Sequence, residues 1–298
     1  MSTRPFRLPA SGPLLGIVLI LVANFFFSFV DTGSKWLGVI GLSALQLAFM
    51  RYFVHFVISV GIFGKNGFDW SVFRCEKLIL VIIRGACLML ATVANFIAIQ
   101  YLSLSLTATI LFSAPIIICA LSWPILKEPV GKFRWMAIGL GFIGILIAIR
   151  PFDDDFHWAA FVSLAGAFSF ALYSIFTRQL TGVVSADTMQ FWAGLVGTVA
   201  LIPFAIIEWQ SPTTEFQWVV LLSLGFFAWA GHQFMTNAMA YAPPNLIMPF
   251  GYSFVIYLTV WSFFIFDEIP DRWTLLGAVI IIIAGLIIWF REKKQASE

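Results

Sequence analysis

Long apolar runs separated by short polar turns recur along the whole chain. Ten runs can be marked, at 13–35, 42–63, 78–100, 104–125, 133–149, 156–178, 187–207, 217–240, 245–266 and 273–290. Each is about as long as a helix that crosses the hydrocarbon core of a bilayer. None alternates with the period of two that a membrane barrel needs, and in lipid a lone segment satisfies its backbone only as a helix. The pattern predicts an all-α membrane protein with ten transmembrane helices.

The composition supports this prediction. Of 298 residues, 61% are hydrophobic and 11% are charged, whereas soluble domains are about half apolar and about a quarter charged. A water-soluble protein of this size could not bury so much apolar surface. The composition therefore excludes a soluble enzyme or a nucleic-acid-binding module. The expected partners are the lipid bilayer and a small-molecule solute, with no nucleic acid.

The positive charges predict the orientation of the helices, because Lys and Arg concentrate in cytoplasmic loops. If the N-terminus is cytoplasmic, twelve of the 17 basic residues lie inside and three lie outside, namely Lys35, Arg150 and Arg272. The other two, Arg51 and Arg84, lie within the runs. Both chain termini are therefore expected in the cytoplasm.

The two halves of the chain show a weak internal repeat. A shift of 140 residues aligns 101–128 with 241–268 without a gap, and seven of the 28 positions are identical: Tyr101/Tyr241, Leu106/Leu246, Ser113/Ser253, Ile116/Ile256, Ser122/Ser262, Ile125/Ile265 and Glu128/Glu268. Because each half holds five runs, an odd number, the second half must enter the membrane inverted. We expect a first repeat at 13–149 and an inverted second repeat at 156–290. Inverted repeats are typical of transporters, although a duplication could also serve only to build a stable bundle.

Several segments resemble the EamA branch of the drug/metabolite transporter superfamily. In the first half these are residues 98–105, 112–115, 127–131 and 141–144; in the second half they are 240–243, Pro249-Phe250, Tyr252, 266–271 and Gly277. The resemblance covers nearly the whole chain and implies a ten-helix carrier of the bacterial inner membrane that works by alternating access. Residues 31–38, Arg51 and 268–271 are more narrowly similar to bacterial S-adenosylmethionine uptake carriers. This narrower resemblance implies S-adenosylmethionine or a related amino-acid-like solute.

Charged residues at bilayer depth are candidate sites, because burying an unpaired charge in lipid costs several kcal/mol. Asp31 lies near the outer end of the first run and shares a helix face with Lys35, four residues later. The two can form an interfacial ion pair, or they can act as an outer gate or in proton coupling. Arg51 lies in the second run with His55 one turn deeper. Arg51 either clasps Asp31 or binds the solute. His55, taken by itself, is expected to be a packing residue.

A second group of polar residues is expected nearer the inner side. Arg84 either reaches the inner interface or binds an anionic group of the solute in a cavity. His232 and Tyr252 come to a similar depth, so the three form a candidate polar layer. Trp229 and Tyr252 could clamp a planar or cationic solute, and Asn237 adds a further polar contact. Each of these side chains can instead be a packing residue, and His232 can also carry a proton.

Prolines interrupt several of the runs. Pro115 and Pro249 lie in the fourth and ninth runs, and we expect them to bend helices that line the cavity and take part in gating rather than to form static kinks. Glu128 and Glu268 are expected to anchor turns. Glycines in the fifth and tenth runs allow close helix packing, which is consistent with a homodimer.

These features favour a secondary transporter that takes up or exports a small metabolite, with proton coupling and exchange both open. Export of amino acids or other metabolites is an alternative. An integral membrane enzyme acting on lipids would need a catalytic constellation, but the three histidines are dispersed and no HExxH pattern occurs. A channel would need a selectivity filter, which is not evident. We expect no catalytic residues, no metal site and no cofactor.

Overall fold

The computed structural model describes residues 12–65, 75, 77–126, 131–154, 156–180, 183–241 and 248–297. The elements in these ranges are all helices: α1 (Gly12–Val39), α2 (Ala44–Lys65), α3 (Leu78–Tyr101), α4 (Leu104–Leu111), α5 (Ala114–Leu126), α6 (Lys132–Ile149), α7 (Ala159–Leu180), α8 (Ala186–Glu208), α9 (Glu215–Tyr241), the 3-10 helix η2 (Met248–Tyr252), α11 (Ser253–Phe266) and α12 (Arg272–Ser297). The predicted all-α fold is confirmed. The first helix extends four residues beyond its predicted end at 35, and Asp31 and Lys35 lie within it, as predicted.

The helices have the length and composition of membrane spans. Among the described residues, eight stretches are long and apolar enough to cross a bilayer, with α4 and α5 counted as one, and the apolar stretches Trp135–Ile149 and Phe250–Phe266 are shorter. Many large apolar side chains are exposed on the outside of the bundle, among them Ile79, Phe142, Ile207 and Phe264. Lipid is the solvent that suits such a surface.

The predicted fourth helix is broken at Phe112-Ser113, between α4 and α5. Pro115 accounts for this position, because proline has no N–H to donate to the carbonyl of residue 111 and its ring collides with that carbonyl. The Ser113 hydroxyl covers part of the break by donating to the Ile110 carbonyl at 2.6 Å. The ninth helix is irregular at the matching place, where η2 leads into α11 at Ser253.

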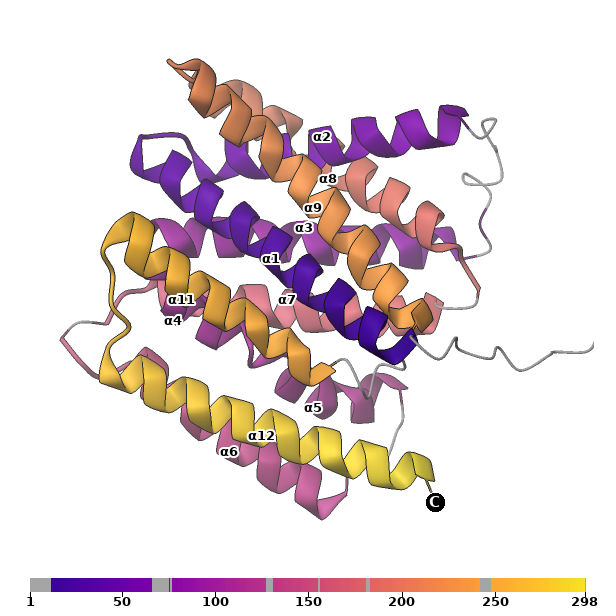
Figure 1. The fold of residues 1–298 in the computed structure, drawn as a ribbon, viewed down its shortest axis with the longest axis vertical. Helices are drawn as coiled ribbons and strands as arrows, with labels where there is room; N and C mark the ends of the chain where they lie inside the picture. Colours follow the sequence, from indigo (N-terminus) through magenta and orange to yellow (C-terminus); the bar gives the residue numbers. More distant parts are fainter. Residues whose placement is uncertain are drawn as a thin grey trace, which may run out of the picture.

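Helices from the two halves of the chain interleave. The closest packing pairs are α1 with α9, α3 with α7, α2 with α8, and α6 with α12, and α4 packs on α11. Figure 1 shows α1 and α9 lying side by side and running in opposite directions, with α6 and α12 together at one edge. The start of α1 and the end of α12 lie on the same side of the bundle (Figure 1).

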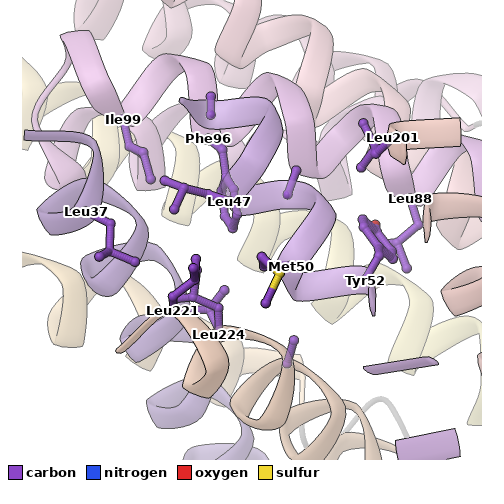
Figure 2. Close-up of a cluster of buried hydrophobic side chains, with 14 of the residues drawn as sticks. Leu37, Leu47, Met50, Tyr52, Leu88, Phe96, Ile99, Leu201, Leu221 and Leu224 are labelled. Atoms are coloured by element: carbon purple, nitrogen blue, oxygen red, sulfur yellow. The ribbon is translucent and has the colours of Figure 1, made fainter. Parts of the chain in front are cut away.

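An apolar core joins α1, α2 and α3 of the first half to α8 and α9 of the second. Figure 2 shows this cluster, which includes Leu37, Leu47, Tyr52, Phe96, Leu221 and Leu224. These side chains are almost fully buried. Close packing of this kind fixes the helices that carry the polar residues described below.

Two glycines of the predicted fifth and tenth helices pack against each other within the chain. Gly144 on α6 and Gly277 on α12 face each other, and a Cβ at Gly277 would lie 2.7 Å from the Gly144 carbonyl oxygen. This close approach of the two backbones explains the pattern of small residues. The homodimer stays a prediction, and it does not need these two glycines.

Candidate functional site

A cavity of about 250 Å³ lies between the two halves. Its lining comes from α1, α2, α3, α4, α5 and α7, and from α9, η2 and α11. Most of the wall is apolar, and its largest members are five phenylalanines: Phe27, Phe96, Phe112, Phe170 and Phe254. The polar members are Asn24, Asp31, Arg51, Thr92, Asn95 and His232. An apolar pocket with a few converging polar groups is the usual form of a small-molecule site.

Asp31 lies in the cavity wall rather than at an interfacial ion pair. Its side chain on α1 is buried, with 8% of its surface exposed. Asn95 on α3 donates to Asp31 Oδ2 at 3.0 Å, and Oδ1 accepts no hydrogen bond from the described residues. Of the two alternatives for Asp31 and Lys35, the ion pair between them is therefore not formed.

Arg51 reaches the same cavity from α2, but the expected clasp with Asp31 is absent. The described ion pairs, defined by separations up to 4.0 Å, do not include Arg51. Its Nη1 donates to Thr92 Oγ1 at 2.6 Å, whereas its Nε is buried without a hydrogen-bond partner. The Tyr52 hydroxyl lies 2.9 Å from the same Thr92 oxygen and helps to fix its place.

Lys35 binds Glu268, which the sequence analysis treated as a turn anchor. Lys35 Nζ lies 2.6 and 2.7 Å from the two carboxylate oxygens and 3.0 Å from the Leu102 carbonyl oxygen. Ser262 also donates to this carboxylate, at 2.9 Å. This network joins α1 to the turns after α3 and α11, beyond the residues that line the cavity.

Arg84 is held away from the cavity. Its Nε donates to Thr177 at 2.7 Å, its Nη1 to the Met189 carbonyl at 3.1 Å and its Nη2 to the Tyr173 hydroxyl at 2.9 Å. Its guanidinium also stacks 4.5 Å from the centre of the Tyr173 ring. Arg84 is outside the residues that line the cavity. It ties α3 to α7 and α8.

The expected polar layer and aromatic clamp are not assembled as predicted. Trp229 and Asn237 are outside the cavity lining, and Asn237 is exposed. Tyr252 is half-buried, with its ring 4.9 Å from that of Phe112 and its hydroxyl against Gly285 of α12. Phenylalanine supplies the aromatic wall instead. The number of phenylalanines in the sequence hid which of them face inward.

His232 does line the cavity. Its ring lies 5.0 Å from Phe27 in an edge-on arrangement and 6.2 Å from His55, which is outside the lining. His55 Nε2 is buried without a hydrogen-bond partner. In the part of the chain that the structure describes, no group of three His, Cys, Asp or Glu side chains could hold a metal ion.

The structure places only one of the two prolines that the sequence predicts to take part in gating. Pro115 lines the cavity at the start of α5, directly after the helix break. Pro249 falls in η2, but its side chain lies outside the described residues, as does Glu128.

Sequence reasoning missed three polar residues of the cavity, Asn24, Thr92 and Asn95. Asn24 on α1 donates to the carbonyls of Phe250 and Gly251 at 3.2 and 3.3 Å, and to the Ser253 hydroxyl at 3.0 Å. It thereby satisfies the irregular backbone where η2 meets α11. The sequence did contain a signal for Asn24, namely an amide side chain within an apolar run. Burying such an amide costs free energy unless it forms hydrogen bonds.

Comparison with known proteins identifies the family. Residues 14–150 and 157–290 each match the EamA-like transporter family. The chain belongs to this family. It is 29% identical to an S-adenosylmethionine uptake transporter of Rickettsia bellii over 95% of this chain and 96% of that protein. It is 26% identical to a riboflavin transporter of Vibrio cholerae, over 95% and 96%. It is 24% identical to the pseudopaline exporter CntI of Pseudomonas aeruginosa, over 94% and 97%.

A solved crystal structure shares the fold, with a TM-score of 0.63 and 14% identity over 93% of this chain and 96% of that one. The resemblance seen in the sequence motifs is thus confirmed. This EamA-family protein is a multi-pass membrane transporter of small metabolites and not an enzyme.

Proposed function

We propose that this transporter carries S-adenosylmethionine or a related amino-acid-like solute across the bacterial inner membrane by alternating access. The observation that carries the proposal is the cavity between the halves, which holds one carboxylate, one guanidinium and an aromatic wall. An amino-acid-like solute offers the matching charges. The cavity volume of about 250 Å³ is just below the usual range of about 300–1,000 Å³ for small-molecule sites. The S-adenosylmethionine uptake transporters among the relatives favour the same class.

The proposed architecture is ten spans in two inverted repeats, 13–149 and 156–290, with both termini in the cytoplasm. The distribution of positive charge supports this orientation. The family matches each half separately. The helix packing is also reciprocal: the first helix of one half packs on the third of the other, as α1 on α9 and α7 on α3.

A contact between Phe112 and Tyr252 gives independent support for the repeat. Their rings lie 4.9 Å apart, and the two positions differ by the 140 residues of the sequence repeat. A residue can touch its own repeat equivalent only near the axis that relates the two copies. The breaks of α4 at Ser113 and before α11 at Ser253 follow the same offset.

Alternating access requires that the cavity open to one side at a time. The Lys35–Glu268 network closes one end of the bundle, because it ties α1 to the second half. The helix breaks at Ser113 and Ser253 give the walls places to bend without losing further hydrogen bonds. In this mechanism Lys35 belongs to a gate, and Asp31 and Arg51 belong to the solute site.

The test begins with thermal unfolding of the detergent-purified protein in the presence of S-adenosylmethionine, S-adenosylhomocysteine, amino acids and riboflavin. A ligand that binds the folded state raises the melting temperature in a concentration-dependent way. We expect S-adenosylmethionine to do so, and counterflow of the labelled compound in proteoliposomes should then show saturable exchange. The Arg51→Gln variant should show a smaller shift at the same ligand concentration, whereas Trp229→Ala, outside the cavity, should keep the full shift. A shift with riboflavin alone would contradict the proposed solute class.

A further inference from the structure

The two charges in the cavity wall are both buried, yet they are not paired with each other. Asp31 and Arg51 are each 8% exposed. They are close enough to interact electrostatically, but no ion pair within 4.0 Å joins them. Removing two charges from water is costly unless each gains a close partner. The separation leaves both charges incompletely satisfied.

We infer that Arg51 and Asp31 together bind a zwitterionic solute. Arg51 binds its α-carboxylate, and Asp31 binds its α-ammonium group. The inference rests on the proposed function, because it takes the cavity as the transport site. It narrows the solute class to compounds with a free α-amino and a free α-carboxyl group.

Arg51 has donors left for a carboxylate. Among the described residues, its guanidinium donates through Nη1 to Thr92 Oγ1, and it also lies beside Tyr52, 5.0 Å from the centre of the ring. Thr92 in turn donates to the Leu88 carbonyl at 3.0 Å, so α3 holds the guanidinium in one orientation. A planar guanidinium with open N–H groups is suited to a carboxylate, which it can bind through two parallel bonds.

Asp31 has an acceptor left for an ammonium. Asn95 occupies Oδ2 through its amide nitrogen, whereas Oδ1 accepts no hydrogen bond from the described residues. Oδ1 is therefore available to accept a hydrogen bond from a solute cation. The Asn95 amide fixes the carboxylate in the same way that Thr92 fixes the guanidinium. Both charged groups are held in place before any solute binds, which lowers the entropy lost on binding.

The rest of the cavity has few polar groups with which to recognise a side chain. Phe27, Phe96 and Phe254 present rings that can stack on a planar base or face a sulfonium cation. Such contacts are tolerant of shape and lack directional hydrogen bonds. We therefore expect strict selection for the amino-acid end of the solute and loose selection for the remainder.

The test removes each charge from the solute and from the protein in turn. The ligands are S-adenosylmethionine, its decarboxylated form and its 2-oxo form, which lacks the amine; the proteins are the unmodified chain, Arg51→Gln and Asp31→Asn. Binding is measured by titration of the purified full chain. We expect the unmodified protein to bind each trimmed ligand at least about tenfold more weakly than S-adenosylmethionine, since each leaves one buried charge unpaired. Arg51→Gln should lose only its preference for the carboxylate, and Asp31→Asn only its preference for the ammonium.

Controls separate recognition from folding. Trp229→Ala should keep both preferences, because Trp229 is outside the cavity lining. Arg51→Lys keeps the charge without the planar fork, so it should retain part of the carboxylate preference, which shows that a folded site is being measured. If S-adenosylmethionine does not bind, the amino acid that gives the largest thermal shift takes its place, together with its amide and its oxo acid.

The outcomes are distinct. The inference is supported if Arg51→Gln loses only the preference for the carboxylate and Asp31→Asn loses only the preference for the ammonium. If a zwitterion binds but Arg51→Gln still prefers the carboxylate by the same factor, the inference is overturned while the proposed function stands. If no zwitterion binds and a compound such as riboflavin does, both are overturned.

Discussion

Lys35 and Glu268, 233 residues apart in the sequence, form an ion pair at 2.6 Å across the two halves of the bundle. The lysine is buried and the glutamate is partly exposed. The pair joins the last turns of α1 to the turn after α11, and these ends of α1 and α11 lie on the side of the bundle opposite the start of α1 and the end of α12 (Figure 1). The gate proposed above predicts that opening this end of the cavity breaks the pair.

A charge swap tests the Lys35–Glu268 connection. Lys35→Glu places two carboxylates together, and we expect it to lower the free energy of unfolding by about 2–4 kcal/mol and to abolish counterflow. The double variant Lys35→Glu/Glu268→Lys restores opposite charges and should recover part of both. Thermal unfolding and proteoliposome counterflow provide the measurements. A double variant no better than Lys35→Glu would show that the pair does not connect the halves.

The two intramembrane arginines should respond in opposite ways to the same substitution. Arg84→Gln leaves the partners on α7 and α8 without their donor, so it should lower the free energy of unfolding by about 2–4 kcal/mol. Arg51→Gln removes a charge that lacks a carboxylate partner, so without solute its stability should be unchanged or higher. Thermal unfolding without solute decides between them. A larger loss for Arg51→Gln would make Arg51 a structural residue.

Asn24 should be needed as a donor and not only for its size. Asn24→Asp keeps the shape but replaces the amide donor with an acceptor facing the Phe250 and Gly251 carbonyls. We expect a loss of about 1–3 kcal/mol in the free energy of unfolding, since two carbonyls lose their partner. Asn237→Asp makes the same chemical change at an exposed position and should have little effect. If the two substitutions had equal effects, the hydrogen bonds of Asn24 to the Phe250 and Gly251 carbonyls would not be needed for stability.

Gly277→Ala tests where the glycine face of α12 is used. The new methyl group would lie against the Gly144 carbonyl and Ala148, so α6 and α12 would have to separate. We expect a loss of about 1–3 kcal/mol in the free energy of unfolding, with no change in oligomeric state. Gly139→Ala on α6 meets nothing within 4 Å and should be neutral or slightly stabilising. An altered oligomeric state at unchanged stability would instead place this face in a dimer.

The sequence was sufficient to predict the helices because helix formation in lipid depends on each segment alone. Each run must satisfy its own backbone in lipid, so its length and apolar content were enough to predict α2, α3 or α8. The motifs around Tyr101 and Tyr241 were also sufficient for the family. Pro115 indicated an interruption, and the break itself appears at Phe112-Ser113, directly after Leu111, whose carbonyl the proline cannot pair.

The partners of the polar residues were decided by tertiary structure alone. Lys35 is one turn from Asp31, yet its side chain reaches Glu268, and Arg84 reaches α7 and α8 instead of the cavity. Depth along a helix can be estimated from the sequence, but the direction of a side chain around the helix axis depends on which neighbours pack there. Helices that are apolar on all sides carry no pattern that reveals this rotation. The sequence thus determined a helical membrane transporter, whereas the packing of its two halves decided that Asp31, Arg51 and five phenylalanines share one cavity.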